Sequence, residues 1–308
     1  MKTTSNVQRV TSNAKEGYRT MKRYDYLKPY SVEEALDLLA GVGDTAMLIA
    51  GGTDVLVKRK LGQIDPAALI SLKSIPDMSY IKENGMLTIG AMTTHRQLET
   101  SPLIHSRYPI LHDAVKNIGS VQIRNTATIG GNIVNAAPSA DTAPPLLALE
   151  AVARIRGPQG TRDVPLTEFF VGPGRTTMQP NEILTELVLT RHTSPCGGAY
   201  YKLSRRAAMD LPLLGVAVQL YLEPDRQTIR QARLAYGVAG PTPMRAFAAE
   251  ALLEGRKPTP EILDEMAQAV CQGTSCRNSL RASAWYREEM ITVFTKRMIR
   301  LAMERAAT

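Results

Sequence analysis

Apolar residues in the first quarter of the chain follow the pattern of a β-α-β-type unit. A short strand is predicted at residues 24–29. Ser31, with a glutamate three residues later, forms a capping-box pattern before the apolar stripe of a helix over residues 31–40. Compact apolar strands are predicted at residues 46–50 and 68–72, on either side of a double glycine. The unit therefore spans about fifty residues.

The second part of the chain changes between strand-like and helical periodicity. Period-two alternation predicts a strand at residues 87–91, a short helix starts at residues 94–98, and helical periodicity returns at residues 103–118. Residues 122–138 show neither period and are rich in small and polar side chains. An aperiodic segment of this length inside a compact domain is usually functional. Two further strands are predicted after it, at residues 151–156 and 183–190, separated by a turn at residues 170–175.

The last third of the chain runs from strands to helices without alternating between them. A linker is predicted at residues 192–199. Three antiparallel strands are predicted after it, at residues 199–203, 214–222 and 229–238. Helices are then predicted at residues 244–253, 260–270 and 283–306. Strands followed by helices are typical of an α+β domain.

The composition is that of an ordinary globular protein. Of the 308 residues, 44% are hydrophobic and 21% are charged, and the length allows two domains. No run of eighteen or more apolar residues occurs, which argues against a membrane span. The polar first twenty residues lack the apolar centre of a signal peptide, which predicts a cytoplasmic location.

The positive charge of the chain raises the question of nucleic-acid binding, since the net charge is +8 and the pI is 9.4. The basic residues do not cluster, and no aromatic side chains alternate with the two densest runs, residues 58–60 and 205–206. A nucleic-acid-binding module is therefore disfavoured. The excess charge suits either a cofactor that carries a pyrophosphate or an acidic partner subunit.

Cysteine and histidine side chains show no spacing typical of a metal site. The cysteines, too few for a disulfide framework, are Cys196, Cys271 and Cys276. The histidines have neither metal-ligand spacing nor a neighbouring nucleophile: His95, His105, His112 and His192. His95 is predicted to be a satisfied surface or capping histidine near the start of a short helix. We therefore predict no bound metal and a reducing compartment.

Two adjacent glycines follow the buried strand at residues 46–50. Glycine permits positive φ and a close approach of the backbone, and successive N–H groups in such a turn form a concave anion site suited to a pyrophosphate. The alternative is a plain strand-to-helix turn with Asp54 as the cap. The candidate residues of this first turn are Ile49, Ala50, Gly51, Gly52, Thr53, Asp54, Val55 and Leu56.

A second glycine pair stands in the aperiodic segment at residues 122–138. The candidate residues of this second turn are Thr128, Gly130, Gly131 and Asn132. Two such turns in one fold can grip both phosphates of a dinucleotide from opposite sides, and Asp141 would be free to accept hydrogen bonds from hydroxyl groups. Together the two turns predict cofactor binding.

Both turns carry sequences that resemble one family. The runs IAGGTDVL (residues 49–56), QIRNTATIGGN (residues 122–132) and PSAD (residues 138–141) resemble the FAD-binding medium subunits of molybdenum hydroxylases. This group contains carbon monoxide dehydrogenase, xanthine dehydrogenase and 4-hydroxybenzoyl-CoA reductase. The likeness runs from Met21 to the end of the chain and continues through GPGRT, PNEIL and YKLSR.

The resemblance implies an α+β protein in two parts. The first is a two-subdomain FAD-binding fold of the vanillyl-alcohol oxidase and p-cresol methylhydroxylase type, expected at residues 21–195 with subdomains at about 21–76 and 77–195. The second is a C-terminal flavoprotein domain at residues 196–308, with a three-stranded antiparallel sheet and helices. Residues 1–20 are predicted to form a disordered extension.

The resemblance also assigns roles to residues that the patterns alone leave plain. Matching positions imply that both turns hold the FAD diphosphate and that Asp141 bonds the flavin's polar chain or the adenosine part. Ile118 and Leu184 match positions where the family sandwiches the flavin ring between apolar side chains. Lys202 matches a lysine near the ring edge, where a cation stabilises reduced, anionic flavin. Without the resemblance, these would be two core residues and a strand lysine.

Two absences in the sequence limit what the resemblance implies about iron clusters and about FAD attachment. The chain lacks the cysteine-rich insert of the 4-hydroxybenzoyl-CoA reductase type, so the extra four-iron cluster of that type should be missing. Neither turn has a histidine or a cysteine, so FAD is expected to bind without a covalent bond.

The implied function is that of a FAD-binding electron-transfer subunit of a heteromeric molybdenum hydroxylase, which is an oxidoreductase. A large subunit would hold molybdopterin, and a small subunit would hold two-iron clusters. The three subunits would form a dimer of heterotrimers, in which electrons pass to FAD and then to an external acceptor. The alternative is a stand-alone FAD-dependent oxidase or dehydrogenase that acts directly on a small organic substrate.

The last predicted helix carries an apolar stripe that suits either partner docking or core packing. Its members are Trp285, Met290, Val293, Phe294 and Met298.

Overall fold

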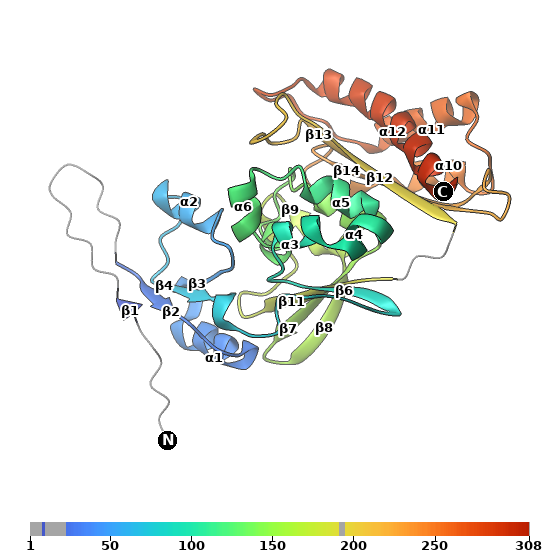
Figure 1. Cartoon of the computed structure of the whole chain (residues 1–308). Helices are drawn as coiled ribbons and strands as arrows, with labels where there is room; N and C mark the ends of the chain where they lie inside the picture. Colours follow the sequence, from blue (N-terminus) through green and yellow to red (C-terminus); the bar gives the residue numbers. More distant parts are fainter. Residues whose placement is uncertain (1–7, 10–22, 191–194, 308) are drawn as a thin grey trace.

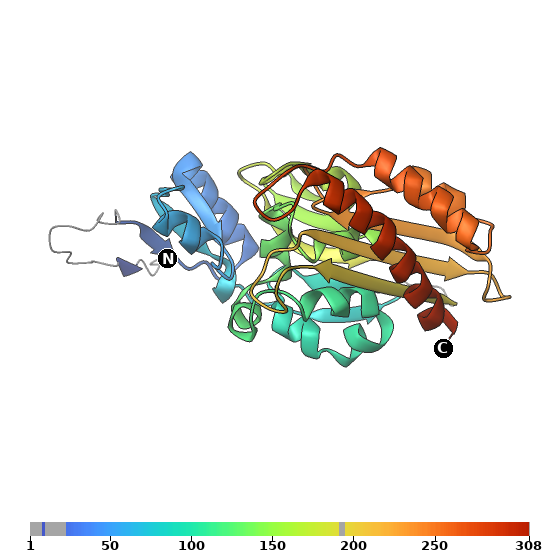
Figure 2. The same ribbon diagram turned by 90° about the horizontal axis from the view of Figure 1, so that it is seen from above.

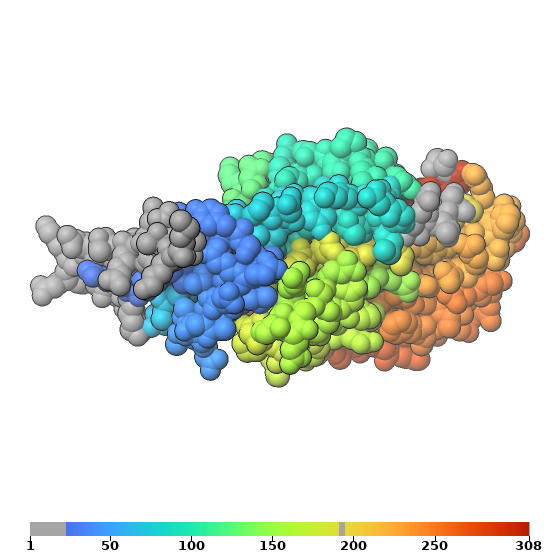
Figure 3. Space-filling model, turned by 90° about the horizontal axis from the view of Figure 1, so that it is seen from below, coloured from blue at the N-terminus to red at the C-terminus, as the bar shows by residue number. Residues whose placement is uncertain are grey.

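The computed structural model describes residues 8–9, 23–190 and 195–307 (Figure 1). Within these ranges the strands form three sheets of four or five strands and one two-stranded sheet. The N-terminal sheet lies at one end of an elongated molecule and the C-terminal sheet and helices at the other (Figure 3). Most of the predicted N-terminal extension and the start of the predicted linker lie outside the described residues. In the part that the structure describes, no helix combines the length and the apolar character that crossing a membrane requires.

The N-terminal sheet confirms the predicted β-α-β-type unit. Its strands β2 and β3 both pair in parallel with β4, and β1 adds an antiparallel edge beside β2. The elements of this unit are β1 (Gln8–Arg9), β2 (Asp25–Leu27), α1 (Val32–Val42), a 3-10 turn (Gly43–Thr45), β3 (Ala46–Ile49), α2 (Val55–Lys60), β4 (Ala68–Ser71) and a second 3-10 turn (Leu72–Ser74). In Figure 1, α1 and α2 lie on opposite sides of the sheet.

The cap of α1 follows the predicted pattern with one change. The Ser31 hydroxyl accepts a hydrogen bond from the Glu34 amide at 3.0 Å. The Glu34 carboxylate reaches back one residue further than a capping box requires, because it accepts from the Tyr30 amide at 2.7 Å. Both bonds fix the point at which the chain enters the helix.

The middle sheet is five-stranded and antiparallel, in the order β5-β6-β11-β7-β8. Its strands are β5 (Ile81–Asn84), β6 (Met86–Gly90), β7 (Val152–Gly157), β8 (Gly160–Pro165) and β11 (Ile183–Leu189). The sequence predicts the three central strands but neither edge strand. The edge strands are missed because β5 alternates only partly buried with exposed residues and β8 is exposed at all but one position, so neither carries the apolar pattern of a core strand.

Short helices fill the chain between β6 and β7. They are α3 (His95–Thr100), α4 (Pro102–Arg107), α5 (Pro109–Val115), α6 (Val121–Thr126), α7 (Ile129–Val134) and α8 (Ala143–Ala148). The predicted aperiodic segment at residues 122–138 therefore contains most of α6 and all of α7. Each of these helices has six residues, which is less than two turns and too short to show a period of 3.6. After β8 come α9 (Leu166–Phe169) and the β9–β10 hairpin (Phe170–Gly172 and Arg175–Thr176).

The C-terminal domain is α+β, as predicted. Its antiparallel sheet has the order β12-β13-β14-β15, with β12 (Cys196–Leu203), β13 (Leu214–Leu222), β14 (Ile229–Gly237) and β15 (Met244–Arg245). The fourth strand is a two-residue addition at residues predicted to begin a helix, and β12 starts within the predicted linker. The helices are α10 (Phe247–Leu253), α11 (Pro260–Gly273) and α12 (Ala284–Ala307). Figure 2 shows α11 and α12 covering one face of this sheet, while α5 and α8 of the preceding part also contact its strands.

The apolar stripe on α12 serves mainly the core. Phe294 and Met298 are buried in the C-terminal hydrophobic cluster, and Met290 packs against it. Trp285 is the exception, since 68% of its surface is exposed. Core packing therefore accounts for most of the stripe, while the tryptophan stays on the surface and Val293 is half-buried.

Candidate functional site

The first turn leaves a row of backbone N–H groups without partners. The chain leaves β3 at the buried Ile49, and Gly52 then takes a φ of 78°, which favours glycine. Among the described residues, the amides of the loop from Gly51 through Asp54 donate to no acceptor. Consecutive free amides in a turn make a concave site of partial positive charge. The first turn therefore has the form predicted for an anion site.

Asp54 does not act as the cap that the plain-turn alternative requires. It stands at the N-cap position of α2, but its side chain makes no capping hydrogen bond. Its backbone is in the right-handed helical region, whereas a capping residue normally has an extended conformation. The capping role considered for this residue is therefore wrong, and its carboxylate lies exposed.

The two turns lie side by side, as the sequence predicts. A Cβ atom at Gly51 would lie 2.1 Å from the Thr126 carbonyl oxygen, so only glycine allows this approach of the two backbones. A Cβ atom at Gly131 would lie 3.7 Å from the Ala50 methyl group. One turn further on, the Lys58 ammonium of α2 donates to the side-chain oxygen of Asn135 at 2.7 Å. Figure 1 shows α2 next to α6 across this junction.

The second turn is not a hollow lined with free amides, and that prediction is wrong. Residues 128–134 form the capped start and body of α7, and the amides of residues 129–132 are all used within the protein. The Thr128 hydroxyl accepts from Gly131, and the Thr128 carbonyl accepts from Asn132. The Ile129 and Gly130 amides donate to the Thr93 and Ala91 carbonyls, both at 2.9 Å.

The glycine at position 130 is required by packing. A Cβ atom there would lie 2.6 Å from the Ala91 carbonyl oxygen and 2.6 Å from the Ala91 methyl group. The side chain of Asn132 is also engaged, because its oxygen accepts from the Thr142 hydroxyl at 2.6 Å. The second turn therefore acts as a packed surface against which the first turn lies.

Asp141 is held in a buried network instead of being free. Its carboxylate accepts from the Tyr200 hydroxyl and from the Lys202 ammonium, each at 2.8 Å. The ammonium also donates to the Asn117 carbonyl at 2.9 Å. The side chains of Asp141 and Lys202 are each 7% exposed. The network therefore ties β12 to two loops of the preceding part of the chain.

Burial and charge act against each other in this network. Burial raises the pKa of the Asp141 carboxyl, while the Lys202 ammonium and the Tyr200 hydroxyl act in the opposite direction. Burial and the neighbouring carboxylate raise the pKa of Tyr200 well above its usual range. The phenol has room because position 215 is glycine, where a Cβ atom would lie 2.9 Å from the Tyr200 oxygen.

Ile118 and Leu184, the two positions predicted to flank the flavin ring, are both buried. Ile118 follows α5, and its carbonyl accepts from Arg124 at 2.9 Å. Leu184 lies on β11 opposite Ile155 of β7, within the first hydrophobic core. Both side chains are apolar and buried, and their contact with a flavin ring stays a prediction.

His95 is a polar core residue that sequence reasoning placed on the surface. It is fully buried, and neither ring nitrogen has a hydrogen-bond partner among the described residues. Burial, with a smaller contribution from the charge of Arg124, lowers its pKa to about 4. The capping role belongs to Thr94, which forms a capping box with Gln97. That T-x-x-Q pattern, visible in the sequence, would have placed His95 one position inside the helix.

No group of histidine, cysteine and carboxylate side chains within the described ranges is arranged to hold a metal ion. The three cysteines are unpaired and partly buried. The site consists of the first turn, the junction with α6 and α7, and the Asp141 network.

Two family models together match most of the chain. One is described as the FAD binding domain in molybdopterin dehydrogenase and matches residues 21–189. The other is described as the CO dehydrogenase flavoprotein C-terminal domain and matches residues 199–302. The gap between the two matches, residues 190–198, includes the start of β12.

Individual relatives are similar over nearly their whole length. The chain is 35% identical over 288 residues to a putative xanthine dehydrogenase FAD-binding subunit of Escherichia coli (strain K12), covering 91% of this chain and 96% of the relative. It is 34% identical over 286 residues to the carbon monoxide dehydrogenase medium chain of Hydrogenophaga pseudoflava, covering 92% and 99%.

Solved structures show the same fold. A chain of carbon monoxide dehydrogenase from Hydrogenophaga pseudoflava matches with a TM-score of 0.89 and 35% identity, covering 93% of this chain and 99% of that chain. A chain of quinoline 2-oxidoreductase from Pseudomonas putida 86 matches with a TM-score of 0.87 and 24% identity, covering 94% and 100%. The second likeness concerns the fold alone.

Proposed function

This chain belongs to the FAD-binding medium subunits of the molybdenum hydroxylases, the family of xanthine dehydrogenase and carbon monoxide dehydrogenase, and we propose that it is the electron-transfer subunit of such an enzyme. The observation that carries the proposal is the row of free amides from Gly51 through Asp54, at the start of a helix and beside α7. A diphosphate is the part of FAD that such a row binds.

FAD is the proposed cofactor, bound without a covalent link. The first turn, residues 49–56, would hold the diphosphate through backbone N–H groups. The second turn would shape the site by packing against Gly51 and would contribute few donors of its own, since its amides are already paired. Bound FAD supplies the chemistry of this role, because it exchanges electrons one or two at a time.

The remaining predicted residues keep their roles as proposals. Ile118 and Leu184 would contact the flavin ring with buried apolar side chains. Lys202 would place a positive charge near reduced flavin, and its ammonium is held for that task by Asp141 and the Asn117 carbonyl. Asp141 would act chiefly through this lysine, because both of its oxygens are already engaged.

The partners proposed are those of a three-subunit molybdenum hydroxylase. A large subunit would carry molybdopterin, and a small subunit with two-iron clusters would deliver electrons to this chain, in a cytoplasmic dimer of heterotrimers. Electrons would leave to an external acceptor. We place the boundary between the FAD-binding domain and the C-terminal domain at residue 195, between the two family matches.

Isolation of the full tagged chain from native cells tests the proposal. We expect FAD absorbance together with a large molybdenum-containing chain and a small iron–sulfur chain. Gly51→Ala should lose FAD, because its Cβ atom would lie 2.1 Å from the Thr126 oxygen. Gly41→Ala is the matched control, since nothing lies within 4 Å of a Cβ atom there.

Two results would contradict the proposal. A wild-type chain that shows no flavin absorbance after incubation with excess FAD would remove the cofactor. A lone yellow protein, without iron or molybdenum, that reduces its own FAD with an organic substrate would favour the stand-alone oxidase instead.

A further inference from the structure

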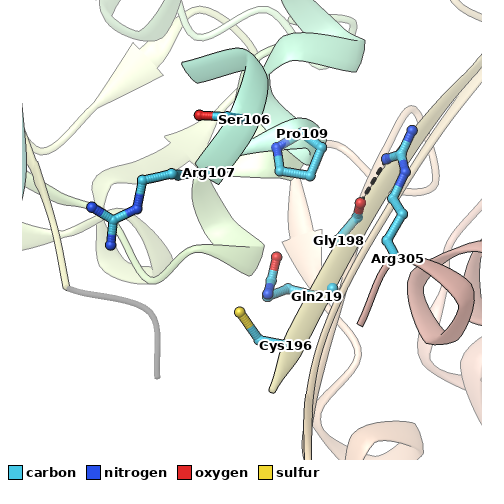
Figure 4. Close-up of a pocket in the computed structure, with 8 residues that line it drawn as sticks. Ser106, Arg107, Pro109, Cys196, Gly198, Gln219 and Arg305 are labelled. Carbon is cyan, nitrogen blue, oxygen red and sulfur yellow. Dashed lines mark hydrogen bonds between the residues drawn. The ribbon is translucent and has the colours of Figure 1, made fainter. Parts of the chain in front are cut away.

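A cavity separate from both turns lies where α4 meets β12, β13 and the end of α12 (Figure 4). It has a volume of about 220 Å³. Its polar lining comes from Ser106, Arg107, Cys196, Gln219 and Arg305. None of these residues belongs to the first turn, the second turn or the Asp141 network. The cavity therefore lies outside the site proposed for FAD.

The side chain of Gln219 is unpaired in this cavity. The residue is only 2% exposed, and what remains accessible of its amide faces the cavity, where it makes no hydrogen bond to a residue that the structure describes. Figure 4 shows the amide beside the Cys196 thiol, between Arg107 on one side and Arg305 on the other. A Cβ atom at Gly198 would lie 2.2 Å from the Gln219 oxygen, so glycine makes room for the amide. Polar groups are normally hydrogen-bonded, so an amide that faces a cavity without a protein partner is available to water or to a ligand there.

The charged side chains of the lining are arginines, and each of them is paired with a carboxylate outside the lining. Two arginines and no carboxylate line the cavity. Arg107 binds Glu83 through Nη1, while its Nε and Nη2 groups donate to no acceptor within the described ranges. Arg305 is fixed by the Asp113 carboxylate and the Gly198 carbonyl, both at 2.7 Å. The cavity thus presents hydrogen-bond donors and cationic groups to whatever it binds.

The charge of one lining arginine, Arg107, reaches the thiol in the cavity. Burial raises the pKa of Cys196, and the charges of Arg107 and Arg230 act in the opposite direction. Positive charge in a partly enclosed site attracts anions and repels cations. The ligand expected from this lining is therefore an anion that accepts hydrogen bonds.

We propose that this cavity binds a small oxyanion, a phosphate or a carboxylate, through the Gln219 amide, with the Arg107 guanidinium at the edge of the cavity supplying positive charge. A planar guanidinium and a primary amide both donate to such oxygens. The volume of about 220 Å³ is below the roughly 300–1,000 Å³ typical of sites for drug-sized ligands. A nucleotide is therefore too large, and inorganic phosphate or a short carboxylate is the expected size.

Isothermal titration calorimetry of the FAD-loaded full chain tests this site. FAD loading matters because free amides of the first turn also attract phosphate. Sodium phosphate and sodium acetate are titrated separately, with ionic strength held constant by sodium chloride. We expect saturable binding by the wild type and an affinity lower by about tenfold or more in Gln219→Leu.

Two further variants control the titration. Gln231→Leu makes the same change at an exposed position on the neighbouring strand β14 and should bind as the wild type does. Arg107→Gln removes charge from a side chain that is 44% exposed, where the fold tolerates change, and should also weaken binding. A rise in the thermal unfolding midpoint with the bound anion should follow the calorimetric affinities.

Each outcome decides the proposal. Saturation by phosphate alone identifies a phosphate site, saturation by acetate alone a carboxylate site, and saturation by both a general oxyanion site. The absence of saturable heat with either salt would overturn the inference. So would unchanged affinity in Gln219→Leu, because the binding would then lie elsewhere.

Discussion

Mild acid should destabilise this protein through one buried group, His95. The folded-state pKa of about 4 lies below the value of ~6.5 for a histidine in an unfolded chain. Between these two values the unfolded chain binds more protons than the folded protein. The free energy of unfolding therefore falls as the pH is lowered through this window.

The size of the effect follows from the shift. Over the whole window the shift corresponds to about 3 kcal/mol, and about 2 kcal/mol of this is lost between pH 7.5 and pH 5. The full shift applies because the ring is fully buried and its nitrogens have no partners among the described residues. His95→Leu should abolish this contribution and should be at least as stable as the wild type at pH 7.5, since it removes two unpaired polar atoms.

Urea unfolding of the full chain, followed by circular dichroism at a series of pH values, measures the effect. His105→Leu, at an exposed histidine, is the control and should keep the wild-type pH dependence. A loss of stability in His95→Leu between pH 7.5 and pH 5 that is as steep as that of the wild type would refute the role of His95. In that case other groups would govern the acid response.

Three substitutions test the contacts of the site. Gly51→Ala should lower the free energy of unfolding by about 1–3 kcal/mol and should weaken FAD binding, because its Cβ atom would overlap the Thr126 oxygen. Urea unfolding measures the first effect and flavin fluorescence the second. Asp141→Asn should lower the free energy of unfolding by about 3–5 kcal/mol, since it leaves the Lys202 ammonium buried without its counter-ion. A loss of less than about 1 kcal/mol in urea unfolding would contradict the importance of this ion pair. Gly215→Ala should displace the Tyr200 side chain, which would change the near-ultraviolet circular dichroism and lower the free energy of unfolding by about 1–3 kcal/mol. An unchanged spectrum would speak against the contact between Gly215 and Tyr200.

Local patterns predict the fold well where one face of an element is buried. The strands of the parallel N-terminal sheet and the three long strands of the C-terminal sheet follow their apolar patterns. The edge strands β5 and β8 escape prediction, because a solvated edge has no apolar requirement. The helices α6 and α7 escape it for a different reason, since a helix of less than two turns cannot display its period.

The glycine pairs show what a sequence motif leaves open. Both pairs were interpreted as ligand-binding turns, yet only the first leaves its amides free. Gly130 is glycine because the Ala91 backbone occupies the space of a side chain, and that contact joins residues far apart in the chain. A motif alone cannot distinguish a backbone that approaches a ligand from one that approaches another part of the protein. The buried state of His95 and the pairing of Asp141 with Lys202 depend on such long-range packing in the same way.

The contact between Gly51 and the Thr126 carbonyl constrains how the molecule can move. Two backbones that touch with no side chain between them cannot slide past each other without a steric clash. We therefore expect this contact to act as a pivot, about which the N-terminal sheet tilts as one rigid piece. The free amides of the first turn lie beside the pivot and would stay nearly in place, and the hydrogen bond from Lys58 of α2 to Asn135 would limit the tilt.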